Sequence, residues 1–455
     1  MTNVTGSPFL AYDIRGKVEE QLTEEMVYKI GLAYCRLVKP RTVVVGMDIR
    51  PTSKMISDNL CRGLNDGGAD VLDIGLCGTE MVYFATPYLE ADGGIMITAS
   101  HNPKGYNGMK LVKGGAVPIS RDNGLHDIRD MVERERIKEG VEEGSRIETD
   151  IREPYIDKVV SFLSEPDRLR DLKMVTDPGH GCAGPALDLI AERLDLDLVR
   201  MHHEPDGSFP AGVPNPILPQ MRGAVSKAVV ENTADAGIAW DGDFDRCFLF
   251  DEKGEFTEGY YIVGLLAGSM LEKEGGGKII HDPRLVWNTV EIVEEMGGTP
   301  IMNKTGHAFI KDRMRSEDAV YGGEMSAHHY FRGFHYCDTG MIPWLLVMEM
   351  MAVQNRPLSE LIDERRRRYP VSGEINRRVK DQKRVIDAVE SRYTKNAVSV
   401  DHTDGVSIEH EKFRFNLRSS NTEPLIRLNV ETRGNSELLR KVTENILNMI
   451  DEEAG

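Results

Sequence analysis

The sequence predicts an α/β protein with three similar α/β domains and a smaller α+β domain at the C-terminal end. Its length of 455 residues is too great for one ordinary hydrophobic core and predicts three or four domains. Apolar strands alternate with helix-length segments three times over, which indicates βαβ units with mixed sheets. After Tyr369-Pro370 the pattern changes to alternating strands and one amphipathic helix.

Three stretches share one plan, in which a short apolar strand leads into a turn that contains aspartate. They are residues 43–48, 173–178 and 278–283. Tens of residues later each is followed by another strand with a similar entrance, at 91–95, 234–238 and 317–321. We interpret this as three copies of one domain. If these later strands run the same way in their sheets, the loops that follow them can face one cleft.

The expected domains are 1–148, 149–253, 254–368 and 369–455. In the last of them Asp404-Gly405 separates two short strands and predicts a hairpin. Apolar residues at helical spacing near the end predict a terminal helix. They are Leu438, Leu439, Val442, Ile446 and Ile450.

Composition excludes several classes of partner. The formal net charge of −18 argues against nucleic acid and against anionic membrane surfaces, which need a basic face. No apolar run approaches the roughly 20 residues that span a bilayer, and the first twelve residues lack the pattern of a signal peptide. We therefore expect a cytoplasmic protein. Its six cysteines are scattered and are expected to be reduced, mostly buried thiols.

The loop after the predicted strand 93–97 is the first candidate for chemistry. It carries a hydroxyl, an imidazole and an amide before Pro103 prevents regular continuation. Ligands of open α/β sheets bind at the carboxyl ends of strands. Ser100, with Lys110 in reach as a proton acceptor, is therefore a candidate for phosphoryl or acyl transfer. The alternative is a Ser/Thr or Asx turn that only connects two elements.

The second candidate is the turn that holds Asp241, Asp243 and Asp245 after an apolar strand. An EF-hand is excluded, because its sixth position needs glycine and is Arg246 here. A phosphatase with an aspartate nucleophile remains open but leaves Ser100 without a role. We prefer a magnesium site in which phosphorylated Ser100 supplies a further oxygen, since a phosphoserine beside three carboxylates needs a cation. Arg246 either adds positive charge there or forms a salt bridge within the loop.

Two later loops have the chemistry of sugar and phosphate binding. Glu324 and Ser326 lie two residues apart at a strand end, which suits recognition of vicinal hydroxyls. The loop 418–424 combines an arginine with successive hydroxyls and turn amides, as phosphate-binding nests do. Either loop could instead be an ordinary solvated connection.

The loop Thr98-Ala99-Ser100-His101-Asn102-Pro103 is similar to the signature loop of the α-D-phosphohexomutases. Three further loops and the turns at 12–16 and 304–307 match the same family, so the resemblance spans the chain. The stretch 240–251 most resembles bacterial members that act on mannose phosphates. The resemblance implies four domains around a central cleft, a Mg²⁺ ion and hexose phosphates as partners.

The resemblance also implies the role of each matching residue. Ser100 would carry the phosphoryl group, with Arg15 close to it. Magnesium would bind Ser100, Asp241, Asp243 and Asp245. Substrate contacts are implied for Tyr12, Arg246, Arg284, His307, Glu324, Ser326, Arg418, Ser420, Asn421 and Thr422.

The general acid or base is expected to be Lys110, with His328 as the second candidate. Because the reference pKa of lysine is about 10.4, the role requires surroundings that lower the pKa of Lys110. His329 directly follows His328, and the sequence leaves open which imidazole faces the site.

The implied activity is reversible interconversion of mannose 6-phosphate and mannose 1-phosphate. A hexose 1,6-bisphosphate would be the intermediate and activator, and the product would supply GDP-mannose synthesis. Glucose phosphates differ only at C2 and are expected as side substrates. A phosphatase that uses the same serine, and a sugar-phosphate sensor without catalysis, are the two alternatives.

Overall fold

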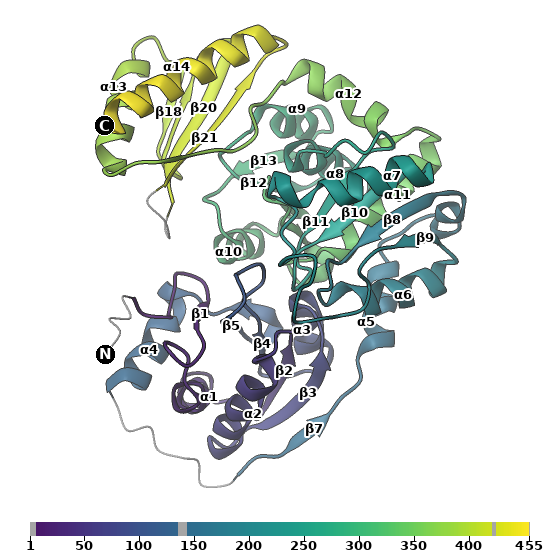
Figure 1. Ribbon diagram of the computed structural model, residues 1–455, viewed down its shortest axis with the longest axis vertical. Helices are drawn as coiled ribbons and strands as arrows, with labels where there is room; N and C mark the ends of the chain where they lie inside the picture. Colours follow the sequence, from purple (N-terminus) through teal and green to yellow (C-terminus); the bar gives the residue numbers. More distant parts are fainter. Residues whose placement is uncertain (1–5, 135–142, 421–424, 455) are drawn as a thin grey trace. The chain divides into compact units, whose positions relative to one another are not determined.

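A computed structural model describes residues 6–134, 143–420 and 425–454, in which the chain forms two compact units (Figure 1). The N-terminal unit consists of Met1–Phe256 and His328–Asn355, and the C-terminal unit of Thr257–Ala327 and Arg356–Gly455. None of the helices among the described residues is long and apolar enough to cross a membrane. All six cysteines are buried and unpaired, which confirms the expectation for them.

The first sheet of the N-terminal unit is mixed. In the described residues seven strands form it, with β6 beside β5 and the others in the order β1-β5-β4-β2-β3-β7. Strands β3, β2 and β4 are parallel, while β5 runs antiparallel to both β4 and β1. The strands are β1 (Ile14–Lys17), β2 (Thr42–Met47), β3 (Asp70–Leu76), β4 (Gly93–Ile97), β5 (Tyr106–Lys113), β6 (Val117–Pro118) and β7 (Arg146–Glu148). The helices are α1 (Glu24–Val38), α2 (Ser53–Asp66), α3 (Thr79–Tyr88) and α4 (Leu125–Arg134).

Strand β4 is buried along its whole length because helices cover both faces. A Cβ on Gly93 would lie 1.7 Å from the hydroxyl oxygen of Tyr34 in α1. A Cβ on Gly94, on the other face, would lie 2.4 Å from Oγ1 of Thr86 in α3. The two glycines therefore let α1 and α3 approach the strand closely, and the strand ends in the loop that carries Ser100.

The second sheet repeats this plan with fewer strands. Its order is β11-β10-β8-β9, with β10, β8 and β9 parallel and β11 antiparallel to β10. Its strands are β8 (Lys173–Asp177), β9 (Asp197–Arg200), β10 (Ala236–Trp240) and β11 (Cys247–Phe250). Its helices are α5 (Arg152–Val160), α6 (Ala183–Leu194) and α7 (Gly223–Asn232). The finding that residues 247–250 form a strand agrees with the rejection of an EF-hand.

A later segment of the chain completes the N-terminal unit. It contains the antiparallel strands β15 (His329–Phe331) and β16 (Cys337–Asp338) and helix α11 (Met341–Gln354). The start of α11 is anchored by Glu80 of α3, whose carboxylate accepts bonds from the amides of Gly340 and Met341. His328 directly precedes β15 and Asp338 ends β16, so both belong to the same unit as Ser100.

The C-terminal unit begins with the third repeat. Strand β12 (Lys278–His281) lies between β13 (Thr299–Met302) and β14 (Tyr321–Gly323) and is parallel to both. The helices are α8 (Gly259–Glu274), α9 (Trp287–Glu295), α10 (His307–Glu317) and α12 (Leu358–Arg368). The three strand-and-turn segments predicted from the sequence are thus β2, β8 and β12.

The last part of the chain forms an antiparallel sheet in the order β17-β21-β20-β19-β18. Its strands are β17 (Ile375–Arg378), β18 (Ser399–Asp401), β19 (Val406–Glu409), β20 (Phe413–Ser419) and β21 (Leu425–Thr432). Helices α13 (Gln382–Tyr393) and α14 (Ser436–Ala454) cover one face and share an apolar core with it (Figure 1). The predicted hairpin at Asp404-Gly405 and the terminal helix are both confirmed.

Candidate active site

Ser100 is the centre of a buried polar cluster in the N-terminal unit. Its side chain follows β4, and the residue is 3% exposed. The hydroxyl donates to Oδ2 of Asp241 over 2.8 Å and lies 2.9 Å from Nδ1 of His101. The backbone of Ser100 has a φ of 50°, a left-handed conformation that is uncommon for a residue with a side chain. This loop thus presents the hydroxyl to the first of the three aspartates.

The register of the first sheet brings two cations beside Ser100. Arg15 on β1 pairs with Gly108 on β5, and Lys110 on β5 pairs with Met96 on β4. The guanidinium of Arg15 donates to the side-chain oxygen of Asn102 over 2.7 Å, on the Ser100 loop itself. Both positive side chains therefore lie where strand pairing places them.

The turn after β10 supplies three carboxylates, all buried. Asp241 and Asp243 are 0% exposed and Asp245 is 2% exposed. The Nζ atom of Lys110 donates to Oδ2 of Asp243 over 2.7 Å and to Oδ2 of Asp245 over 2.5 Å. Thr79, at the start of α3, donates to the same oxygen of Asp243 over 2.5 Å. A lysine from the first domain therefore neutralises part of an acidic turn from the second.

Burial and charge act in opposite directions on the groups of this cluster. Burial alone would lower the pKa of Lys110, but Asp243 and Asp245 outweigh it and raise the pKa above its ordinary value. The role of general base requires surroundings that lower the pKa of Lys110, and these surroundings raise it. Burial favours a higher pKa for Asp243, yet the charge of Lys110 holds that pKa below its usual range. Burial and the charge of Asp243 together raise the pKa of Asp245 to about 6.

The three aspartates fit a hard divalent cation. Each offers one carboxylate oxygen, and these oxygens lie within 4.8 Å of one another. In addition, Oδ1 of Asp243 and Oδ1 of Asp245 are buried and have no hydrogen-bond partner. Carboxylate oxygens that are already desolvated and accept no hydrogen bond suit Mg²⁺, which prefers carboxylates. Asp241, Asp243 and Asp245 could therefore hold the ion.

Arg246 fulfils both roles that the sequence left open. Its Nη2 atom donates to Oδ2 of Asp241 over 2.7 Å, which is the salt bridge within the loop. The same atom lies 2.7 Å from Nδ1 of His101, next to the serine. Burial and the positive charge of Arg246 lower the pKa of His101 well below its ordinary value. His101 therefore stays a neutral neighbour of Ser100.

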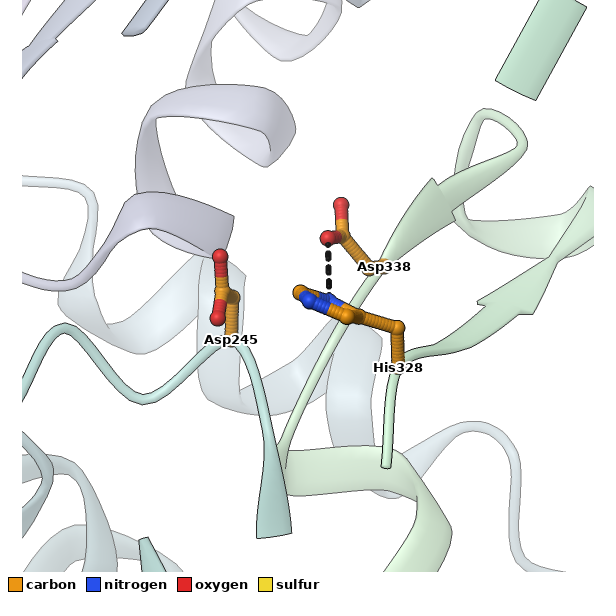
Figure 2. Close-up of side chains that lie close together, drawn as sticks. All are labelled: Asp245, His328 and Asp338. Carbon is orange, nitrogen blue, oxygen red and sulfur yellow. Dashed lines mark hydrogen bonds and ion pairs between the residues drawn. The ribbon is translucent and has the colours of Figure 1, made fainter. Parts of the chain in front are cut away.

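His328 and Asp338 form a hydrogen-bonded pair beside Asp245. The distance from Nδ1 of His328 to Oδ2 of Asp338 is 3.0 Å, and Figure 2 shows the imidazole together with both carboxylates. The side chain of His328 is 19% exposed, whereas His329 is 1% exposed. Burial, with a smaller effect of His328, lowers the pKa of His329 to about 3. The structure thus decides between the adjacent imidazoles in favour of His328.

The C-terminal unit gathers a second set of predicted residues around Arg284. Its guanidinium binds both carboxylate oxygens of Asp282, at 3.0 and 2.7 Å. It also donates to the hydroxyl of Ser326 over 3.3 Å and lies 3.7 Å from Oε1 of Glu324. The same Oε1 accepts the amide hydrogen of Gly306, directly before His307. Arg284, Glu324 and Ser326 therefore form one polar site, and the turn at 304–307 adjoins it.

Three arginines surround one carboxylate in this unit. Glu374 accepts bonds from Arg418 over 3.1 Å and from Arg427 over 3.2 Å, and Arg284 lies 3.8 Å away. Burial favours a higher pKa for Glu374, but the three guanidinium groups hold the pKa below its usual range. Among the residues that the structure describes, no hydrogen-bond partner lies at the buried Nε atoms of Arg418 and Arg427. This excess of positive donors suits a phosphate group.

The remaining predicted residues are placed as follows. Tyr12 is partly buried in the turn before β1, and Ser420 lies just after β20 with its amide bound to the carbonyl of Leu425. Asn421 and Thr422 lie outside the described residues. Sequence reasoning missed Thr79, His101, Asp338, Glu374 and Arg427. Of these, only His101 had a signal, since it stands inside the signature loop.

Comparison with known proteins places the whole chain in one family. Four domain families match in order, each described as phosphoglucomutase/phosphomannomutase. They are alpha/beta/alpha domain I over residues 7–139, domain II over 153–254, domain III over 258–369 and the C-terminal domain over 374–449. A phosphomannomutase of Salmonella montevideo is 53% identical over 99% of this chain and 100% of its own length.

Solved structures give the same result for the fold. A phosphoglucomutase/phosphomannomutase family protein of Burkholderia thailandensis has a TM-score of 0.85 and 28% identity, covering 98% of both chains. An N-acetylphosphoglucosamine mutase of Aspergillus fumigatus, solved with GlcNAc-6P and magnesium, has a TM-score of 0.59 and 14% identity and covers 98% of this chain and 96% of its own. The chain belongs to the phosphoglucomutase/phosphomannomutase family, the α-D-phosphohexomutases, and is a mutase of the isomerase class.

Proposed function

We propose that this enzyme interconverts mannose 6-phosphate and mannose 1-phosphate and so supplies GDP-mannose synthesis. The single observation that carries the chemistry is the hydroxyl of Ser100, held 2.8 Å from Asp241 among buried carboxylates and cations. The preference for mannose rests on the relative with 53% identity over the full chain. A buried serine with a purely structural role would not need charged carboxylates and cations around it.

The proposed reaction has two phosphoryl transfers. Phosphorylated Ser100 gives its phosphoryl group to the free O1 or O6 of the sugar; the P–O bond to serine breaks and one to the sugar forms. The sugar hydroxyl loses its proton to a base. As it leaves, Oγ of Ser100 takes up a proton. The resulting 1,6-bisphosphate turns end for end, Oγ of Ser100 loses that proton and accepts the other phosphoryl group, and the sugar oxygen that leaves takes up a proton.

The residues of the N-terminal unit divide the work of this transfer. A bound Mg²⁺ ion would offset the charge of the phosphoserine and withdraw electrons from the phosphoryl group. Arg15 and Lys110 add fixed positive charge on the neighbouring strands. Because its pKa is raised, Lys110 serves better as an electrostatic group than as a base.

We assign the proton transfer to His328. When Nδ1 donates its proton to Asp338, the other ring nitrogen is left with a lone pair that can accept a proton. Asp338 also stabilises the imidazolium that forms. Lys110 keeps its positive charge, so His328 is the better of these two candidates for the base. The neighbouring His329 is buried and neutral.

Binding of the sugar and of the phosphate that does not react is assigned to the C-terminal unit. Glu324 and Ser326 would bind O3 and O4, which mannose and glucose share. Arg418 and the loop after it would bind the phosphate on C1 or C6. Since none of these residues would contact C2, we expect measurable activity on glucose phosphates as well.

Phosphorus NMR tests the proposal directly. The protein is incubated with Mg²⁺, a trace of sugar 1,6-bisphosphate and either mannose 1-phosphate or glucose 1-phosphate. Appearance of the 6-phosphate without free phosphate is expected, with a higher initial rate for mannose. Free phosphate at the turnover rate would identify a phosphatase, and an unchanged spectrum with metal-dependent sugar-phosphate binding would identify a sensor.

The raised pKa of Asp245 predicts how metal affinity depends on pH. With a pKa of about 6, this carboxyl is largely protonated at pH 5 and must lose its proton before it can bind a cation. The affinity for Mn²⁺, measured by electron paramagnetic resonance on the unphosphorylated enzyme, should fall about tenfold from pH 7 to pH 5. An affinity that stays constant over this range would contradict the prediction. Asp245→Asn should bind more weakly and lose this pH dependence.

A further inference from the structure

Arg50 lies in the turn after β2, and its side chain contacts the backbone of the Ser100 loop. Its Nη2 atom donates to the carbonyl oxygens of Ser100 and Asn102, both over 2.7 Å. Its Nη1 atom donates to the carbonyl oxygens of Pro103 and Tyr106, over 3.2 and 3.1 Å. One guanidinium thus binds four backbone carbonyls within a stretch of the loop that includes the serine itself.

Beyond the side-chain bonds of Ser100 to Asp241 and of Asn102 to Arg15, the bonds within the loop itself are local. The amide of Asn102 donates to the carbonyl of Ala99, and the amide of Tyr106 to that of Pro103. The amide of Ser100 donates to the hydroxyl of Thr98. These bonds close local turns, and none of them reaches the carbonyl oxygens of Ser100 and Asn102. An unsatisfied buried carbonyl is costly, so the donors of Arg50 stabilise the conformation in which Ser100 has positive φ.

Arg50 is itself held in place by contacts with Asp48 and Phe209. Its side chain is 2% exposed, and its Nε atom lies 3.3 Å from Oδ2 of Asp48. The other oxygen of Asp48 accepts the amide of Arg50 over 3.0 Å and the hydroxyl of Ser53 over 2.5 Å. The ring of Phe209, from the second domain, lies 5.7 Å from the guanidinium carbon.

The segment around Phe209 fits closely over this turn. A Cβ on Gly207 would lie 2.2 Å from the carbonyl oxygen of Ile49, so only glycine allows the approach. The guanidinium of Arg50 is itself buried, and hydrogen bonds to carbonyls are stronger in a buried site than in water.

We propose that Arg50 is a positioning residue that holds the Ser100 loop so that its hydroxyl faces the acidic cluster. The role rests on the proposed function of Ser100 as carrier of the phosphoryl group. It requires arginine, because a planar guanidinium offers five donors in a fixed fork, whereas an ammonium offers three from one point. If Arg50 only neutralised Asp48, lysine would serve equally well.

The substitution Arg50→Lys separates these roles, since it keeps the charge and removes the fork. Hydrogen exchange followed by mass spectrometry is measured over residues 98–107, together with kcat and KM. We expect exchange in this stretch to accelerate about tenfold or more and kcat to fall about tenfold or more. KM should change by about twofold at most, because the proposed sugar contacts lie in the C-terminal unit.

Arg62→Lys is the matched control. Arg62 is exposed on α2, where it donates to Asn59 and lies over the ring of Tyr28. It should leave both exchange and kcat unchanged. Arg50→Met tests the same loop with the charge removed; if that variant does not fold, Phe209→Leu replaces it and should accelerate exchange in the loop by a smaller factor.

Exchange and kcat like those of the wild type in Arg50→Lys would overturn the proposal. The exchange measurement needs no catalysis, so its result stands apart from the role of the serine. If Ser100→Ala proved fully active while Arg50→Lys loosened the loop, the proposed function would fail and the positioning role would survive only as a structural one.

Discussion

Replacement of Ser100 by alanine is expected to reduce mutase turnover by about 10⁴-fold or more. In the proposed mechanism this hydroxyl carries the phosphoryl group between the two transfers, and alanine has no atom that can take its place. The variant should keep its fold, because the hydroxyl contributes one bond to Asp241 and little packing. Turnover is measured in a coupled assay with mannose 1-phosphate.

Intact-mass spectrometry provides a second reading of the same variant. The wild type incubated with sugar bisphosphate should gain one phosphoryl group, and Ser100→Ala should gain none. The control is Ser161→Ala, which removes an exposed hydroxyl bound only to the carbonyl of Lys158. Full activity of Ser100→Ala would refute the phosphoserine mechanism.

Asp243→Asn should lower turnover by about 10²- to 10³-fold at saturating substrate. The change removes a negative charge from the predicted metal site and from the ion pair with Lys110. It can also place an amide donor against the ammonium group, which leaves a buried donor without an acceptor. The loss should persist at high Mg²⁺ concentration, because ligand geometry as well as affinity is affected.

The measurement is initial rate against Mg²⁺ concentration, with the thermal midpoint recorded in parallel. Asp167→Asn is the control, since its side chain is 83% exposed and pairs only with Arg170 over 3.2 Å. A variant with normal turnover and an unchanged Mg²⁺ dependence would show that Asp243 is no ligand. A large drop in thermal midpoint would instead assign the loss to the buried ion pair.

Which positive side chains pair with the three aspartates is visible only in the folded protein. From the sequence, a phosphoserine beside three aspartates requires a cation, and Mg²⁺ and Arg246 are the positive groups expected there. The structure adds Lys110, which binds Asp243 and Asp245 directly, and shows Arg246 bound to Asp241. The cluster is therefore less negative than the turn alone suggests, and the raised pKa of Lys110 favours the proposed role as a fixed charge over that of a base.

The sequence by itself determined the strands, the turns and the loops that carry chemistry. The strands before the Ser100 loop and the aspartate turn, β4 and β10, are short apolar runs with polar ends, and such signals lie within about ten neighbouring residues. The repeated plan of β2, β8 and β12 was readable for the same reason. Family-like motifs such as 98–103 are also local, so Ser100 and the aspartates could be named at once.

Only the tertiary structure decided which distant side chains meet. Lys110 and Asp243 are 133 residues apart, and Arg50 and Ser100 are 50 apart. Asp338 and Arg427 lie in ordinary strands and Glu374 directly before one, and their roles become visible only from the partners that packing brings to them. Burial and opposing charge then set their pKa values, because both depend on all the groups that surround a site rather than on its neighbours in the chain.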